Sequence, residues 1–152
     1  MTRPGYRVVA HSANGAALAG YGSFFTAAAA LLGVNAPVPT AAVMSPRSLV
    51  KLGGLVDSTG QPLQVPGMLE NVKLLATPAI PDNLATGTSD DTSELYLGDF
   101  SCVLFMMREQ MSIQLLREAF ATTGQIGFLC HVRADLAVTY PQALAVVKGV
   151  RP

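Results

Sequence analysis

The sequence predicts an α+β fold in which short helices pack on a mixed β-sheet with a long C-terminal strand. In the first third of the chain, residues that can cap a helix start are followed by glycines that can end it, which predicts short helices there. Alternating apolar and polar residues near the end of the chain predict the long strand. Half of the 152 residues are hydrophobic, so the chain can bury the core of one compact domain.

The ten acidic and ten basic side chains cancel, so the chain has no net charge to attract nucleic acid or an anionic membrane. We therefore expect no specific nucleic-acid binding and no membrane association. Charged residues make up only 13 % of the chain, which favours surfaces that are covered by copies of the same protein. Cys102 and Cys130 lie in apolar runs, as reduced thiols do, which indicates synthesis in the cytoplasm.

The first helix is predicted after a small, glycine-rich lead-in over residues 8–22. Ser23 can cap a helix over residues 24–32, which are rich in alanine and are followed by Gly33. The prolines that come next predict an extended crossing over residues 35–39.

A strand over residues 41–44 and a second helix are predicted next. Ser45 can accept bonds from free amides at the helix start, and the proline that follows loses nothing there by lacking an N–H. We expect this helix to span residues 46–51 and to stop at the glycines 53–54. Residues 72–76 predict a further strand.

Two segments dense in turn-forming residues predict exposed loops. Residues 83–93 are rich in Thr, Ser, Asp and Gly and predict a mobile loop. Residues 57–67 predict a long loop, whose turn formers are Asp57, Gly60, Gln61, Pro62, Pro66 and Gly67.

A tight polar corner is predicted between two strands, over residues 94–97 and 102–107. The corner begins with Gly98, Asp99 and Phe100. An aspartate in this place can accept backbone N–H bonds and hold the two strands at a fixed angle. We therefore interpret Asp99 as a structural residue, which needs no catalytic role.

The end of the chain predicts more strands. Residues 112–117 extend the sheet, although residues 110–121 also fit an amphipathic helix. A turn at residues 141–142 precedes a last strand over residues 143–147. Between them, the long strand is expected to bury the face formed by Phe128, Cys130, Val132, Ala134, Leu136, Val138 and Tyr140.

Neither histidine has neighbours at the spacing of a metal site, so we expect no metal ligands. His131 alternates with Arg133 and Asp135, which favours a salt-bridged or solvated residue on the polar face of a strand over a metal ligand. His11 lies in a small polar segment with no candidate co-ligand.

The remaining candidates also favour structural roles. Ser45 lacks the G-x-S-x-G context of a nucleophile, and the glycines around Tyr21 lack the context of a phosphate loop. The adjacent carboxylates of residues 90–91 are typical of a solvated pair. Met106 and Met107 favour core or subunit-contact packing. We therefore expect no catalytic residue and no cofactor-binding residue.

An ordered set of motifs over residues 41–149 resembles the major capsid proteins of tailed phages of the Hong Kong 97 type. That family has an N/S-P-R helix start, a D-x-x-G turn, a strand with a proline near its end, a G-D-F corner and a terminal β region. The corresponding pieces here are Met44-Ser45-Pro46-Arg47-Ser48, Asp57-Ser58-Thr59-Gly60, Leu74-Leu75-Ala76-Thr77-Pro78, Gly98-Asp99-Phe100 and the strand ending in Tyr140-Pro141.

The resemblance implies an axial domain, whose loops gather around five-fold and six-fold axes, and the returning strands of a peripheral domain. It assigns residues 1–40 to a lead-in with the first helix, residues 41–120 to the axial core and residues 121–152 to the returning strands, all in one compact unit. The family's N-terminal arm, extended loop and spine helix have no counterpart here. The loop of residues 57–67 is expected to approach a symmetry axis.

The function that the resemblance implies is that of a structural capsid subunit, or a fragment of one, and not of an enzyme. It would be made in the bacterial cytoplasm and would enclose a genome in the virion, in contact with copies of itself in pentamer-like and hexamer-like rings and with other capsid components. An encapsulin-like shell that packages protein is one alternative. A non-assembling remnant is another, and a small enzyme or ligand-binding domain that uses the apolar face near Phe105 and Met107 is the third.

Overall fold

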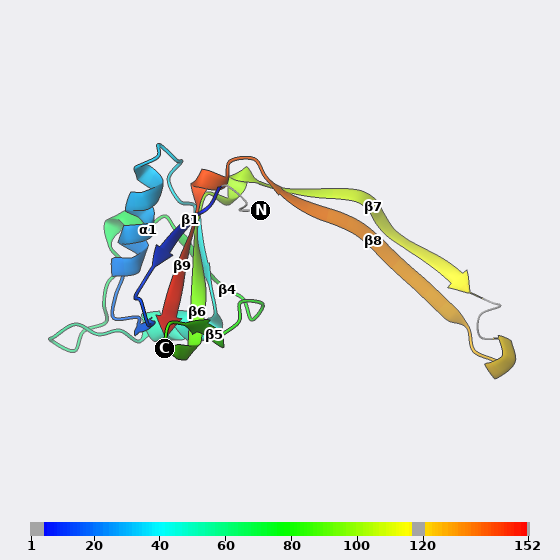
Figure 1. The fold of residues 1–152 in the computed structure, drawn as a ribbon, viewed down its shortest axis with the longest axis horizontal. Coiled ribbons are helices and arrows are strands. Elements are labelled where there is room, and N and C mark those ends of the chain that lie inside the picture. The colour runs from blue at the N-terminus through cyan, green and yellow to red at the C-terminus, as the bar shows by residue number, and fades with distance from the viewer. Residues whose placement is uncertain (1–4, 117–120, 152) are drawn as a thin grey trace. The chain divides into compact units, whose positions relative to one another are not determined.

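The computed structural model describes residues 5–116 and 121–151, and it confirms the α+β class (Figure 1). The chain forms two units. The main unit comprises residues 1–102 and 140–152, and the second unit comprises residues 103–139. These borders differ from the expected ones near residues 40 and 120 and from the expectation of one compact unit, because the two strands described within residues 103–139 pair only with each other.

A mixed sheet forms the centre of the main unit, in the strand order β1-β9-β6-β3-β4. The β1–β9 and β3–β4 pairs are parallel, whereas β9–β6 and β6–β3 are antiparallel. Two short strands extend it, with β2 paired to β9 and β5 paired to β6. The strands are β1 (Arg7–Ala10), β2 (Ala16–Ala17), β3 (Ala41–Met44), β4 (Lys73–Ala76), β5 (Leu84–Thr86), β6 (Ser89–Gly98) and β9 (Leu144–Arg151).

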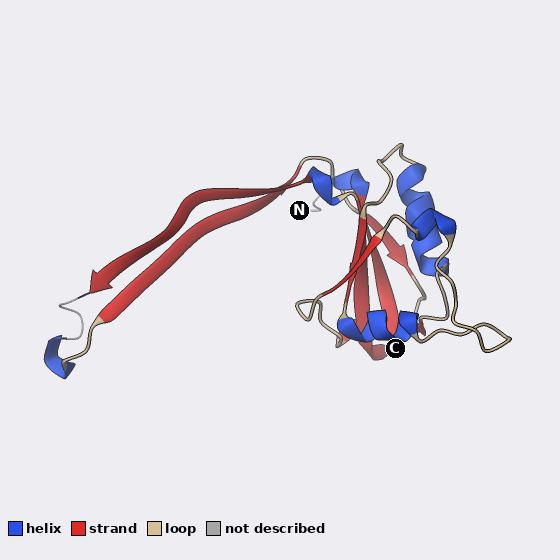
Figure 2. Ribbon diagram, turned by 180° about the vertical axis from the view of Figure 1, so that it is seen from behind, coloured by secondary structure: helices blue, strands red, loops and turns tan. Residues whose placement is uncertain are grey.

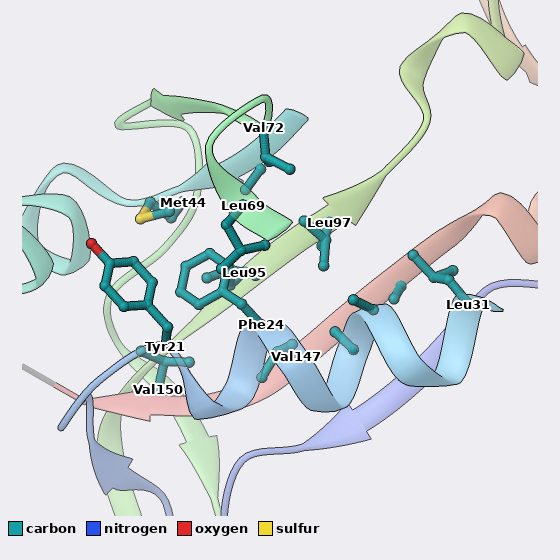
Figure 3. Packing of buried hydrophobic residues seen from close by; sticks show 14 of the residues in the cluster. Tyr21, Phe24, Leu31, Met44, Leu69, Val72, Leu95, Leu97, Val147 and Val150 are labelled. Carbon is teal, nitrogen blue, oxygen red and sulfur yellow. The ribbon is translucent and has the colours of Figure 1, made fainter. Parts of the chain in front are cut away.

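The helix α1 (Gly22–Leu32) covers one face of this sheet, where it contacts β9, β1 and β6 (Figures 1 and 3). It buries Phe24, Ala27, Ala28 and Leu31 against side chains such as Leu95 and Val147. The predicted cap was wrong. Tyr21 holds the N-cap position without a side-chain bond, and Ser23 lies inside the first turn, where its hydroxyl is 2.8 Å from His11 Nδ1.

The second helix and the strand before it were predicted well. The strand β3 covers the expected residues, and α2 (Pro46–Gly53) begins at Ser45, whose Oγ accepts a bond from the Ser48 N–H at 3.3 Å. The helix runs two residues beyond the expected end. Ser45 and Ser48 are both buried, and Leu52 belongs to the core. Packing therefore stabilises the helix start that the capping serine predicts.

The segment predicted as a mobile loop, residues 83–93, is instead a β-hairpin of β5 and the start of β6. Gly87, with φ of +61°, turns the chain between the two strands. Thr92 is buried, and its hydroxyl donates to the Leu84 carbonyl at 2.6 Å. The polar composition that favoured a loop therefore serves hydrogen bonds within the sheet.

The second unit is an antiparallel ribbon of β7 (Val103–Leu116) and β8 (Gly127–Val138) (Figure 2). The strand interpretation of residues 112–117 is confirmed up to Leu116, and the helix alternative is wrong there; residues 117–120 lie outside the described part. The face of β8 that was predicted to be buried is exposed, because β7 and β8 form a sheet of only two strands among the described residues.

Short 3₁₀ helices join several of these elements. They are η1 (Gly67–Leu69), η2 (Phe100–Cys102), η3 (Ala121–Thr123) and η4 (Pro141–Ala143). Over the described residues, no helix has the length and apolar content needed to cross a membrane.

Candidate functional site

The corner after β6 is held by the carboxylate of Asp99, which is only 7 % exposed. One oxygen accepts the Ser101 N–H at 3.0 Å and the Thr40 hydroxyl at 3.4 Å, and the other accepts the Ser101 hydroxyl at 2.8 Å. These bonds, with that from the Ser101 hydroxyl the strongest, hold the pKa of Asp99 below its usual value. A carboxylate with its lone pairs engaged in this way fixes the chain and is poorly suited to accept a proton from a substrate.

Gly98 and Phe100 complete the predicted corner in different ways. Gly98 packs directly on the backbone after η4, because a Cβ there would lie 2.3 Å from the Ala143 carbonyl oxygen. The Asp99 N–H donates to that same oxygen at 3.1 Å. Phe100 starts η2 and lines a pocket on the sheet. The corner therefore joins β6 to β9, where the sequence predicted only a link between β6 and the next strand.

Replacing Asp99 with asparagine is expected to destabilise the protein at neutral pH and to change its acid sensitivity. Since the folded pKa is depressed, the carboxylate contributes stability above the unfolded pKa near 3.8, and this contribution disappears as the pH falls through the folded value. The difference in melting temperature between wild type and D99N should thus be largest above about pH 5 and shrink towards pH 3. A difference that stays constant from pH 7 to pH 3 would contradict this role.

The loop of residues 57–67 is exposed but locally ordered. The Asp57 N–H donates to the Gln61 carbonyl at 2.8 Å, and Gly60, with φ of +81°, closes the turn. Both the hydroxyl and the N–H of Thr59 donate to the Asp57 carboxylate and lower its pKa, with the hydroxyl the larger cause. The remaining predicted residues, Pro62, Pro66 and Gly67, shape the return of the chain to η1. An approach of this loop to a symmetry axis stays a prediction.

On one face of the ribbon of β7 and β8, the residues that pair across the two strands all have apolar side chains. The register pairs Phe105 with Leu136, Ile113 with Cys130 and Leu115 with Phe128. Most of these side chains are exposed, with Phe128 at 67 % and Leu136 at 63 %. We call this surface the apolar ribbon face; it comprises Val103, Phe105, Met107, Ile113, Leu115, Phe128, Cys130, Val132, Ala134, Leu136 and Val138.

The opposite face of the ribbon holds its charges. Glu109 accepts from His131 Nε2 at 3.0 Å and lies 3.6 Å from Arg133 Nε. His131 therefore lies against a carboxylate on the polar face of the strand, as expected. Register shifts flank Glu109 on both sides, so this cluster spans the irregular part of the ribbon. The alternation of apolar and charged residues was read correctly, although the apolar side is not covered by the described chain.

The other candidates have structural partners. His11 Nε2 lies 3.3 Å from the Ala17 carbonyl oxygen, while Nδ1 faces Ser23. Asp91 pairs with Arg151 at 2.8 Å, and the bond from Arg151 is the main cause of its lowered pKa. Among the described residues, no three His, Cys, Asp or Glu side chains gather as metal ligands would.

A surface that the sequence did not predict lies on the sheet face opposite α1. A pocket of about 310 Å³ opens there between Tyr6, Tyr96 and Phe100. The Tyr96 hydroxyl donates to Glu94 at 2.6 Å, and burial, followed by this bond, raises the pKa of Tyr96 to about 12. The alternation over residues 94–97 indicates that this strand has a second face. Most of the other residues that line the pocket on that face come from segments far away in the sequence.

A sequence profile described as the phage capsid family matches residues 14–149. Three solved structures are similar. The capsid of an empty GTA particle is 18 % identical, with a TM-score of 0.71 over 95 % of this chain and 50 % of that one. Gordonia phage Cozz is 14 % identical, with a TM-score of 0.67 over 99 % of this chain and 51 % of that one. The holo-SrpI encapsulin complex of Synechococcus elongatus PCC 7942 is 16 % identical, with a TM-score of 0.60 over 95 % of this chain and 53 % of that one. The chain thus spans about half the length of the structures it matches. No curated protein matches it.

Proposed function

The chain belongs to the phage capsid family and has the Hong Kong 97 fold, and from this premise we propose that it is a structural part of an icosahedral phage shell. In this proposal it contacts copies of itself around five-fold and six-fold axes, encloses the genome with other capsid components, and resides in the virion after synthesis in the bacterial cytoplasm. It performs no catalysis, and the G-D-F corner and the loop of residues 57–67 serve the shape of the subunit.

The apolar ribbon face is the observation that carries this proposal. A two-stranded ribbon is at best marginally stable in water by itself, and this one exposes a continuous apolar surface on one side. Burying one large apolar side chain gains about 1.5–3 kcal/mol, so covering such a face is strongly favourable. The ion-paired side chains Glu109 and Arg133 lie on the other side. A ribbon of this kind fits a protein that is completed by assembly.

A charge placed on the apolar ribbon face is expected to prevent assembly. In Ile113→Lys, an ammonium replaces a side chain that is 60 % exposed in the chain alone, so the fold tolerates it, whereas a covered face would have to desolvate it. Particle yield should fall at least tenfold on gradient sedimentation and negative-stain microscopy of protein expressed with its flanking genes. Gln114→Lys is the matched control, because it adds the same charge on the opposite face one residue away.

Assembly of I113K at wild-type yield would contradict the proposal. An equal loss in both variants would point to charge alone and also count against it. The second candidate, an encapsulin-like shell, is favoured by the similarity to the holo-SrpI complex. Purified particles distinguish the two, since a phage shell would contain nucleic acid that resists added nuclease until the particles are opened, and an encapsulin-like shell would contain a protein cargo.

A further inference from the structure

We propose that the outward side of α1 in one copy docks on the sheet face opposite α1 of the next copy, in a head-to-tail contact. This inference rests on the proposed self-association and names the surfaces that carry it. The occupant of the sheet face is a second copy of this chain, and the contact is repeated around a ring.

The outward side of α1 is apolar although it faces solvent. Phe25 is 38 % exposed and Leu32 is 42 % exposed, and Ala29 lies between them at helical spacing. The helix has no charged residue along its 11 residues. The exposed side also holds Thr26, whose hydroxyl donates to the Gly22 carbonyl within the helix at 3.0 Å, and the described residues cover only the side with Phe24 and Leu31. The other side therefore needs a partner.

The second surface is a row of apolar side chains that crosses all five main strands on the face opposite α1. Register pairing aligns Val8 with Val146, Val146 with Tyr96, Tyr96 with Val43, and Val43 with Leu75. Residues directly opposite each other in a sheet share a face. The two ends of the row are exposed, with Val8 at 56 % and Leu75 at 50 %, Val43 and Tyr96 are partly exposed, and Val146 is buried at 6 %, so a partner would contact the row mainly through the other four side chains. We call this surface the open row.

Charge favours an uncharged, apolar occupant for the open row. Lys148 Nζ lies 3.3 Å from Glu94 Oε1, and the Tyr96 hydroxyl donates to the other oxygen of the same carboxylate. These groups satisfy one another beside the pocket, so they leave no single charge to attract an ionic partner. Lys73, at the edge strand, can remain in water at the rim. The helix side of Phe25 and Leu32 supplies an occupant that matches this neutrality.

The two surfaces lie on opposite faces of the main unit, as Figures 1 and 2 show for α1 and the sheet. One molecule therefore cannot join them within itself, and the contact is heterologous, which is the type that closes rings of more than two copies. The sizes agree: five strands span roughly 19 Å between their axes, and α1, with its 11 residues, is roughly 16 Å long. A contact this small is weak alone and is strengthened when a ring closes.

Photo-crosslinking from residue 25 tests the contact directly. The full chain is made with p-benzoylphenylalanine in place of Phe25, mixed with ¹⁵N-labelled wild-type chain at a concentration where light scattering shows oligomers, and irradiated. Mass spectrometry should find crosslinks between labelled and unlabelled chains in the peptides that contain Val8, Leu75 or Tyr96. Using Val8→Lys in the labelled chain should lower their yield at least tenfold, whereas Val50→Lys, at a site on α2 that is 76 % exposed, should leave it unchanged.

Each outcome decides the matter. Oligomers with crosslinks only to the β7–β8 ribbon, or with a yield that V8K leaves unchanged, would overturn the contact but leave the proposed shell function intact. An equal loss in V50K would overturn the assignment of the surface. If light scattering shows monomers at every concentration and no intermolecular crosslink forms, both this contact and the proposed self-association fail.

Discussion

Replacing Gly98 with alanine is expected to lower the free energy of unfolding by about 1–3 kcal/mol, the usual cost of forcing extra volume into a packed site. The added Cβ would lie 2.3 Å from the Ala143 carbonyl oxygen and 3.0 Å from the Leu144 Cα. Both are backbone atoms, at the end of η4 and the start of β9, so moving the Leu144 side chain, whose Cδ2 would lie at 2.9 Å, cannot relieve the clash. The clash also forces apart the Asp99 N–H and the Ala143 oxygen that it bonds at 3.1 Å.

Urea unfolding followed by circular dichroism measures this effect, with Gly53→Ala as the matched control. Gly53 is the last residue of α2, and a Cβ there meets nothing within 4 Å. Alanine has the better helix propensity, so G53A should be neutral or stabilise the protein by up to about 1 kcal/mol. Equal unfolding midpoints for G98A and wild type would show that Gly98 does not pack closely on the Ala143–Leu144 backbone.

The fold was predictable where the signal is local. Ser45 and the proline after it define a helix start within four residues, and the structure has that start with the expected bond to Ser48. Ser23 is as suitable a capping residue as Ser45, yet its hydroxyl forms a hydrogen bond with His11, which lies twelve residues away in the sequence. In residues 83–93, polar composition predicted a loop, but Thr92 pairs with Leu84 across a hairpin and Ser93 pairs with Val150 of the distant strand β9, which holds the segment in the sheet.

The candidate site divides in the same way. The alternation over β8 revealed an apolar face, because the side-chain period of a strand depends on the strand alone. It could not show that this face stays open, because that depends on what else packs on the ribbon. The open row was invisible in the sequence, since Val8, Val43, Leu75, Tyr96 and Val146 meet only through the pairing of distant strands. Asp99 was identified because a corner residue bonds mainly to its own neighbours.

Replacing Phe24 with alanine is expected to cost about 3–5 kcal/mol of stability, as deletion of a fully buried aromatic ring does. Phe24 is 0 % exposed and points from α1 into the cluster that includes Leu69 and Leu95 (Figure 3). Its ring centroid lies 5.8 Å from that of Tyr21, in a tilted pair that is lost with it. A domain of this size has a total stability of about 5–15 kcal/mol, so F24A should be largely or partly unfolded at modest urea concentrations.

The neighbouring substitution Phe25→Ala separates folding from association. Phe25 differs from Phe24 by one position on the same helix and is 38 % exposed, so its loss should cost about 1 kcal/mol or less in the isolated chain, as surface changes do. If its ring docks on the open row of another copy, F25A should instead weaken association, seen as a higher concentration for half-maximal oligomer formation in light scattering. F24A losing less stability than F25A would contradict the orientation of α1, on which both the core and the head-to-tail contact depend.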